Sequence, residues 1–239
     1  MTVIRRRPIP LHQVRGIVFD LDDTLVSSQA FWTRSVVRTI VRALLVTPGK
    51  IRGIVSSLRS FRAARESTRG EGPFPDLRQE VLKRASLRSG IPASVIQEHV
   101  YPLIYGDFMG LDRYCAAGVP DAIRALKSRG IKVAVLSDYP TEAKLEAAGL
   151  GDLPWDLTMD AEELGALKPA SATFEMAAER LGEDLSRLVY VGDRADTDIE
   201  GAKAVGMHAV QVKRFMKRVS QEADAVVDSA VELPSVLSD

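Results

Sequence analysis

The segment Arg15-Gly-Ile-Val-Phe-Asp-Leu-Asp-Asp-Thr-Leu25 decides how the rest of the chain is interpreted. It begins as a short apolar run and ends in acidic residues. Such a run is too short for a helix and is typical of a buried strand. Asp20 stands at the expected carboxyl end of this strand, and Asp22 follows two residues later. Side chains two apart on an extended segment point the same way, so both carboxylates can face one crevice.

Five more short apolar runs follow along the chain, and each is bounded by glycine, aspartate or serine. They predict strands over residues 132–137, 155–159, 188–192, 208–212 and 225–227. Segments with helical spacing lie between them, most with a glycine just after the last turn, at residues 120–129, 141–148, 171–181 and 198–205. Alternating strands and helices predict an α/β fold, a Rossmann-like parallel sheet with helices on both faces.

Residues 28–110 interrupt this alternation and contain no convincing strand. Their apolar residues fall near helical spacing, and we expect helices within 31–45, 51–61, 77–88 and 93–105. We therefore expect a core made of residues 1–27 and 111–239, with an all-helical insert after the first strand. The first thirteen residues contain Arg5, Arg6 and Arg7 and are predicted to be a loose basic arm.

Length and composition exclude several classes of protein. A chain of 239 residues suits one large domain, or one core with an insert, at ~150 residues per domain. The 32 basic and 32 acidic residues cancel, which argues against a general nucleic-acid binder. A single cysteine excludes an intramolecular disulfide framework and a thiolate zinc cluster. No apolar run approaches the ~20 residues of a membrane span, and no secretory signal is present, so we expect a cytoplasmic protein.

The neutral total conceals an uneven distribution of charge. Residues 28–110 hold thirteen basic and six acidic residues, a net charge of +7, which leaves −7 for the rest. Arg34, Arg38 and Arg62 are the candidates in this insert for reaching an anionic substrate. The alternatives are a solvated helical face, or contact with acidic lipid or a partner.

Acidic residues also follow the strand at 188–192, where Asp193, Asp196 and Asp198 occur. Ligands of α/β sheets bind beyond the carboxyl ends of the strands. A like-charged pair ~4 Å apart costs about 4 kcal/mol at an effective dielectric constant of ~20. Lys168, after the third strand, cannot offset several such pairs alone. The crevice therefore predicts Mg²⁺, which binds oxygen ligands and commonly shares them with substrate phosphate. Asp196 and Asp23 are interpreted as surface-turn or capping residues.

Four short motifs together resemble those of the haloacid dehalogenase superfamily. They are Asp20-Leu-Asp-Asp-Thr24, Ser137, Lys168-Pro169 and Gly192-Asp193…Asp198, in the family's order, each at or just after a predicted strand end. The resemblance spans residues 15 to about 230. It implies that the helical insert is a type-1 cap.

The resemblance also implies roles for five residues of the core. Asp20 would be the nucleophile that forms an aspartyl-phosphate. Asp22 would be the general acid for the leaving group and then the base for water. Thr24 would hold the first motif and, with Ser137, lie at the substrate phosphate. Lys168 would offset the negative charge of nucleophile and phosphate.

The metal site follows from the same resemblance. Mg²⁺ would be held by Asp20, by the backbone carbonyl of Asp22 and by Asp193. Asp198 would be a ligand directly or through water. These groups would stabilise phosphoryl transfer mainly by electrostatics.

Two details refine the expected reaction. The acid at position 22, two residues after Asp20, resembles the pattern of phosphatases and phosphomutases. The dehalogenase and phosphonatase branches of the superfamily lack this acid. Asp138 departs from the pattern, because many relatives carry asparagine there. We expect a Mg²⁺-dependent phosphohydrolase, monomer or homodimer, that cleaves a small soluble phosphomonoester. The alternatives are a phosphomutase on a sugar phosphate and a catalytically idle fold used for binding or regulation.

Overall fold

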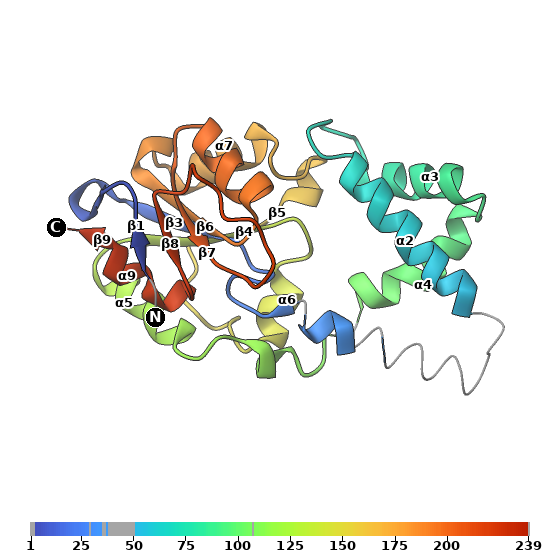
Figure 1. The fold of residues 1–239 in the computed structure, drawn as a ribbon, viewed down its shortest axis with the longest axis horizontal. Coiled ribbons are helices and arrows are strands. Elements are labelled where there is room, and N and C mark those ends of the chain that lie inside the picture. The colour runs from blue at the N-terminus through green and yellow to red at the C-terminus, as the bar shows by residue number, and fades with distance from the viewer. Residues whose placement is uncertain (1–2, 29, 35–36, 38–50, 107, 239) are drawn as a thin grey trace.

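A seven-stranded sheet lies at the centre of the larger part of the molecule (Figure 1). The computed structural model describes residues 3–28, 30–34, 37, 51–106 and 108–238. The strand order is β1-β8-β7-β6-β3-β4-β5. The strands are β1 Ile4–Arg5, β3 Gly16–Phe19, β4 Lys132–Ser137, β5 Leu157–Asp160, β6 Leu188–Gly192, β7 His208–Val212 and β8 Ala225–Val227. All six strands predicted from the apolar runs are present, and the α/β prediction is confirmed.

Strand β3 occupies the position that organises the functional edge of the sheet. It pairs in parallel with β4 on one side and β6 on the other, with Phe19 opposite both Val135 and Val191. The segments that follow these three strands therefore leave the sheet at one edge. Among the described strands of this sheet, only β1 runs antiparallel, against β8.

Helices cover both faces of the sheet because alternate strand residues point to opposite sides. Ile17 and Phe19 of β3 join the apolar cluster that includes α5 and α6, whereas Val18 joins the cluster that includes α7 and α8. These helices are α5 Val119–Ser128, α6 Glu142–Ala147, α7 Ser171–Leu181 and α8 Glu200–Ala204, with a short α9 at Leu233–Val236. Where one helix was predicted over 198–205, a π-helical turn Ala195–Ile199 precedes α8. Among the described helices, none combines the length and apolarity needed to cross a bilayer.

Three further helices pack on one another beside the core, to the right in Figure 1. They are α2 Ile51–Ser67, α3 Leu77–Ser89 and α4 Ala93–Ile104, called the cap helices below. Phe61, Val81 and Val100 are fully buried between them, and Leu167 of the core joins the same cluster. Most of the helix predicted within 31–45 falls outside the described residues, and the insert boundaries at 28 and 110 remain predictions.

The prediction of a loose basic arm was wrong. Strand β1 pairs with β8, and the backbone N–H groups of Arg6 and Arg7 donate to the Asp224 carbonyl at 2.8 and 3.0 Å. Strand β2, Ile9–Pro10, pairs in parallel with β9, Leu237–Ser238, and Ile9 is fully buried. Three consecutive arginines suggested disorder, but the backbone groups of this segment have partners at the other end of the chain.

Asp224 binds the N-terminal segment to the core, and its side-chain contacts make the stability of the fold depend on pH. Its side chain contacts Lys203 Nζ at 2.9 Å, the Ala209 N–H at 2.8 Å and Arg7 Nη1 at 3.4 Å. Burial raises the pKa of Asp224, but contacts with His208, Ala209 and Lys203 outweigh burial and lower it to about 2. An aspartate with a lowered folded-state pKa stabilises the fold above its unfolded pKa, and this contribution fades as the pH falls towards the folded value.

We expect Asp224→Asn to lower the free energy of unfolding at neutral pH by about 2 kcal/mol, the linkage value of such a shift. The difference from the wild type should shrink progressively below about pH 4, where the unfolded aspartate protonates. Urea unfolding at several pH values measures this difference in the free energy of unfolding. Asp152→Asn, at an exposed position, should match the wild type throughout. A destabilisation by Asp224→Asn that stays constant down to about pH 2 would contradict the linkage.

Candidate active site

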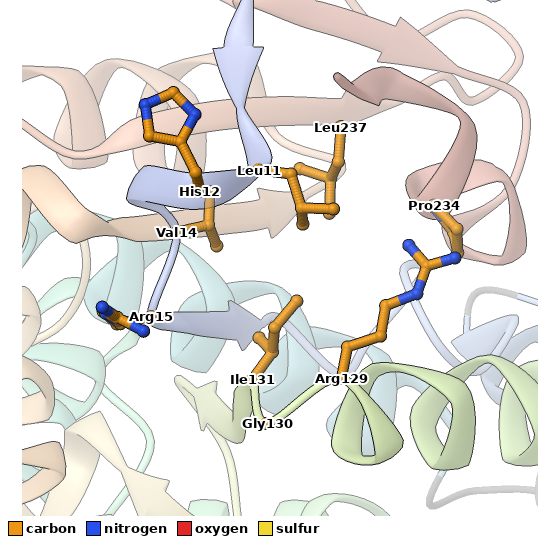
Figure 2. A pocket seen from close by; sticks show the side chains of 9 residues that line it. All are labelled: Leu11, His12, Val14, Arg15, Arg129, Gly130, Ile131, Pro234 and Leu237. Atoms are coloured by element: carbon orange, nitrogen blue, oxygen red, sulfur yellow. The ribbon is translucent and has the colours of Figure 1, made fainter. Parts of the chain in front are cut away.

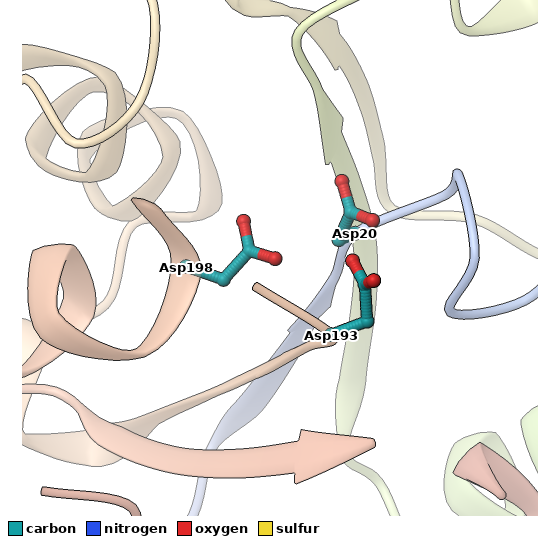
Figure 3. A group of neighbouring side chains, drawn as sticks. All are labelled: Asp20, Asp193 and Asp198. Atoms are coloured by element: carbon teal, nitrogen blue, oxygen red, sulfur yellow. The ribbon is translucent and has the colours of Figure 1, made fainter. Parts of the chain in front are cut away.

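Three carboxylates converge at the carboxyl edge of the sheet (Figure 3). Asp20 follows β3, Asp193 follows β6, and Asp198 lies on the π-helical turn after β6. One oxygen from each lies within 4.8 Å of the others, and the three residues are only 6%, 2% and 1% exposed. The structure thus brings together three of the four acids that the sequence predicted to meet.

Gly192 lets this cluster form. A Cβ at position 192 would lie 2.5 Å from the Asp198 side chain, closer than real Cβ contacts occur. The Asp198 carboxylate also accepts the N–H of Arg194 at 3.0 Å, within the π-helical turn. A side chain at position 192 would therefore displace Asp198.

Lys168 is the cation at the centre of the cluster. Its Nζ donates to Asp20 Oδ1 at 2.7 Å, to Asp198 Oδ1 at 2.8 Å and to the Tyr190 hydroxyl oxygen at 2.8 Å. Tyr190 in turn donates to the Leu136 carbonyl at 3.1 Å. Burial lowers the pKa of Lys168, but Asp198 and Asp20 raise it well above its ordinary value. Lys168 therefore remains charged, and it cross-links the first and fourth motifs.

The cluster nevertheless holds more negative than positive charge. Burial raises the pKa of Asp20 well above its ordinary value, Lys168 opposes this shift, and the neighbouring aspartates reinforce it. Burial and Asp198 raise the pKa of Asp193 to about 6, although Lys217 forms an ion pair with it. Buried carboxylates with raised pKa values suit a divalent cation, and their oxygen donors suit Mg²⁺. The residues present therefore fit the expected metal.

The side chain of Asp22 lies outside this group of three. Ser28 donates to its Oδ1, and Lys144 Nζ lies 2.5 Å from its Oδ2. Lys144 is almost fully buried, with three aromatic rings within 5.9 Å of its ammonium, those of Tyr139, Phe108 and Trp32. The carboxyl group of Asp22 is thus held by Ser28 and Lys144. Metal binding by its backbone carbonyl remains a prediction.

The two predicted phosphate-side hydroxyls are both buried near the cluster's strands. Thr24 Oγ1 donates to Asp20 Oδ2 at 3.2 Å, which orients the carboxylate of the proposed nucleophile. Ser137 is the last residue of β4, and its Oγ accepts the N–H of Tyr139 at 3.2 Å. The hydroxyl proton of Ser137 is not used in that bond. It can be donated to an anion at this edge.

Asp138, the departure from the family pattern, has its charge compensated by the cap. Arg69 Nη1 of the loop after α2 lies 2.6 Å from Asp138 Oδ2, and the Lys168 N–H donates to Oδ1 at 3.1 Å. Burial raises the pKa of Asp138, but Lys168, Arg69 and Arg65 outweigh burial and lower it. The extra carboxylate is therefore ionised and paired.

A cavity of about 660 Å³ lies between the cap helices and the core. Its wall combines residues of both parts: Asp22, Asp23, Ser28, Trp32, Thr33, Val37, Leu58, Arg62, Arg65, Glu66, Leu103, Ile104, Tyr139, Arg194 and Lys217. Of the predicted cap arginines, Arg62 lines this cavity, Arg34 does not, and Arg38 falls outside the described residues. Because Lys217 and Asp22 lie on its wall, the cavity adjoins the acidic cluster.

A second hollow, of about 580 Å³, lies at the opposite edge of the sheet (Figure 2). It adjoins Arg15 and Ile131, the residues just before β3 and β4, and Arg15 and Arg129 stand on two of its sides. These are the amino ends of parallel strands, away from the carboxylates. This hollow therefore takes no part in the site described here.

Four contributing residues were missed by the sequence analysis: Lys217, Lys144, Arg69 and Tyr190. Lys217 follows β7, and its place after a strand end was a signal that could have been used. The ammonium of Lys144 reaches Asp22 from α6, and Arg69 reaches Asp138 from the cap. Such contacts depend on tertiary packing, and the short motifs carry no sign of them.

The chain is similar to several known phosphatases. A glyceraldehyde 3-phosphate phosphatase of Methanocaldococcus jannaschii is 29% identical over 235 residues, which covers 94% of this chain and 97% of that protein. A ribulose-1,5-bisphosphate 5-phosphatase of Halopiger xanaduensis is 39% identical over 113 residues, but this match covers only 45% of each chain.

Solved structures share the fold over nearly the whole length. The crystal structure of a HAD phosphatase from Thermococcus onnurineus superposes with a TM-score of 0.63 at 23% identity, covering 93% of this chain and 97% of that one. The sequence pattern of haloacid dehalogenase-like hydrolases matches residues 14–206, which include every residue of the acidic cluster and Lys168. With this match over most of its length, the chain belongs to the haloacid dehalogenase-like hydrolase family.

Proposed function

We propose that this protein is a Mg²⁺-dependent phosphatase that hydrolyses a small soluble phosphomonoester through an aspartyl-phosphate on Asp20. The observation that carries the proposal is a buried, lysine-paired Asp20 within a three-carboxylate cluster beside a cavity. The near full-length similarity to a glyceraldehyde 3-phosphate phosphatase supports the same class of reaction. A cytoplasmic enzyme, monomeric or homodimeric, is part of this proposal.

In the proposed reaction, an Asp20 carboxylate oxygen attacks phosphorus and the ester oxygen departs. Asp22 supplies the proton that this oxygen takes up, so the alcohol leaves neutral. Water then attacks the phosphorus of the aspartyl-phosphate and gives a proton to Asp22. This hydrolysis releases inorganic phosphate and restores Asp20. Lys168 and Ser137 stabilise the charge on the transferring phosphoryl group.

The metal would be held by Asp20, Asp193 and Asp198, together with the backbone carbonyl of Asp22. When bound, Mg²⁺ supplies positive charge to the phosphoryl oxygens and to the crowded carboxylates. Lys217 pairs with Asp193 at the edge of this group and helps to orient that carboxylate.

Two other functions remain as rivals. A phosphomutase would use the same core residues and return the phosphoryl group to its substrate. Conversion of a sugar 1-phosphate to its isomer without free phosphate would favour this rival. An idle binding protein would release no phosphate from any compound of a broad phosphorylated panel with Mg²⁺.

We expect Asp20→Asn to lower phosphate release at least about 1,000-fold, because the amide cannot act as the nucleophile. The variant should fold, since asparagine keeps the size of the side chain and can accept from Thr24. Phosphate release from p-nitrophenyl phosphate measures the effect. Asp196→Asn, on the same loop as Asp193 but outside the cluster, is the matched control and should keep near-normal activity. Undiminished turnover by Asp20→Asn would remove Asp20 as the nucleophile.

We also expect Mg²⁺ to stabilise the folded protein, with Asp193 needed for this effect. Saturating Mg²⁺ at about 100 times its dissociation constant adds about 2.7 kcal/mol, or roughly 5–10 °C in Tm. Asp193→Asn should lose most of this shift, because one of three charged ligands is gone. Thermal unfolding with and without Mg²⁺ checks it, with Ca²⁺ as a second cation. An equal shift in the variant would place the metal elsewhere.

A further inference from the structure

We propose that the substrate carries a second anionic group, a carboxylate or a second phosphate, and that Arg62 of the cap binds it. This inference rests on the proposed function and adds the class of substrate to it. It concerns the part of the cavity wall that the cap helices form.

Nearly every charged group on the cavity wall already has a partner. The three acidic residues form the pairs Asp22–Lys144 at 2.5 Å, Asp23–Lys217 at 3.1 Å and Glu66–Arg194 at 3.2 Å. Arg65 pairs with the buried Glu162 at 3.0 Å. Within the described part of the chain, Arg62 is the one cation on this wall without an ion pair or hydrogen bond.

Arg62 is exposed to solvent on α2, and the cavity wall beside it is partly apolar. Leu58 lies one turn earlier on α2, and Leu103 and Ile104 of α4 line the same cavity. The planar fork of arginine matches both carboxylate and phosphate.

The cavity wall brings cationic groups of the core and of the cap helices together. Lys217 is the core residue on this wall that pairs with Asp193 of the cluster, and Arg62 is the cap residue on the wall that has no such pair among the described residues. A volume of about 660 Å³ is that of a small-metabolite pocket. A short molecule with phosphate at one end and a second anion at the other would satisfy both.

The experiment compares three substrates of similar length: 2-phosphoglycolate, ethylene glycol bisphosphate and the neutral-ended 2-hydroxyethyl phosphate. Arg62→Ala should lower kcat/KM about 10- to 100-fold for an anionic-ended substrate and less than about twofold for the neutral one. The larger loss identifies carboxylate or phosphate as the preferred group. Arg59→Ala, an exposed arginine of α2 outside the cavity, should change none of them.

An equal loss for all three substrates, or none for the anionic ones, would overturn the inference. If the wild type releases phosphate neither from these three nor from a broad phosphorylated panel, the proposed function fails instead. Calorimetric binding of the same three compounds to the wild type and to Arg62→Ala then still decides the role of Arg62.

A separate set of contacts carries a second inference: we infer that Arg69 and Asp138 are positioning residues for Lys168. Arg69 Nη1 bonds both Asp138 Oδ2 and the Lys168 carbonyl, and Asp138 Oδ1 accepts the Lys168 N–H. Both peptide groups of Lys168 are thus held by one pair, and one member of that pair comes from the insert.

These contacts link docking of the cap to the cluster. The ammonium of Lys168 bridges Asp20 and Asp198, so its direction depends on how its backbone is held. Without Arg69, the buried Asp138 carboxylate would lose its ion pair and disfavour a phosphate nearby. The docked cap therefore both aligns Lys168 and neutralises Asp138.

A double-mutant cycle tests this inference. Arg69→Met and Asp138→Asn should each lower kcat about tenfold and weaken inhibition by vanadate, because Lys168 loses its alignment. The double variant should be little worse than either single one, since both remove the same contact. Arg78→Met is the matched control: it breaks a cap-to-core ion pair with Glu162 that touches neither Asp138 nor Lys168.

Multiplicative losses in the double variant would overturn the inference, and so would an Arg78→Met variant as slow as Arg69→Met. Thermal unfolding of each variant separates a lost fold from a lost alignment. Asp138→Asn removes the ion pair with Arg69 without changing the size of the side chain, so it decides the question even if Arg69→Met unfolds.

Discussion

The ammonium of Lys168 is the interaction on which the acidic edge of the sheet depends. It contacts Asp20 and Asp198 within 2.8 Å, and it is as deeply buried as they are. Two strands of a parallel sheet place their terminal acids side by side, and an enclosed cation reduces the resulting repulsion. One lysine leaves the cluster undercompensated, and that deficit is what suits the site to a metal and a phosphate together.

The sequence predicted the core and its acidic edge because both follow from local rules. Short apolar runs become buried strands, and residues just after parallel strands share an edge, so Asp20, Asp193 and Lys168 could be placed without a structure. The position of Asp22 could not be resolved in the same way. It follows the same strand, but its carboxylate turns to Lys144 and Ser28, whose approach depends on how α6 and the following loops pack.

The failures have a common physical origin. Arg5, Arg6 and Arg7 suggested a loose arm, yet the pairing of Ile4 with Val226 requires a partner more than two hundred residues away in the chain. Asp138 departed from the family pattern without a visible partner, because the cation that compensates it comes from the insert. Composition and spacing describe local preferences, and they do not reveal which distant group satisfies an unpaired one.

The structure also explains in part why the insert is basic and the core acidic. The cap directs Arg65 and Arg78 to Glu162, and Arg69 to Asp138, so part of its basic excess is used against acids of the core. This arrangement favours an internal role for the basic insert over lipid or a partner. Arg62, which lines the cavity without such a counterion in the described part of the chain, differs from these three arginines. Arg65, Arg69 and Arg78 hold the two parts together, whereas Arg62 can bind an anion from outside.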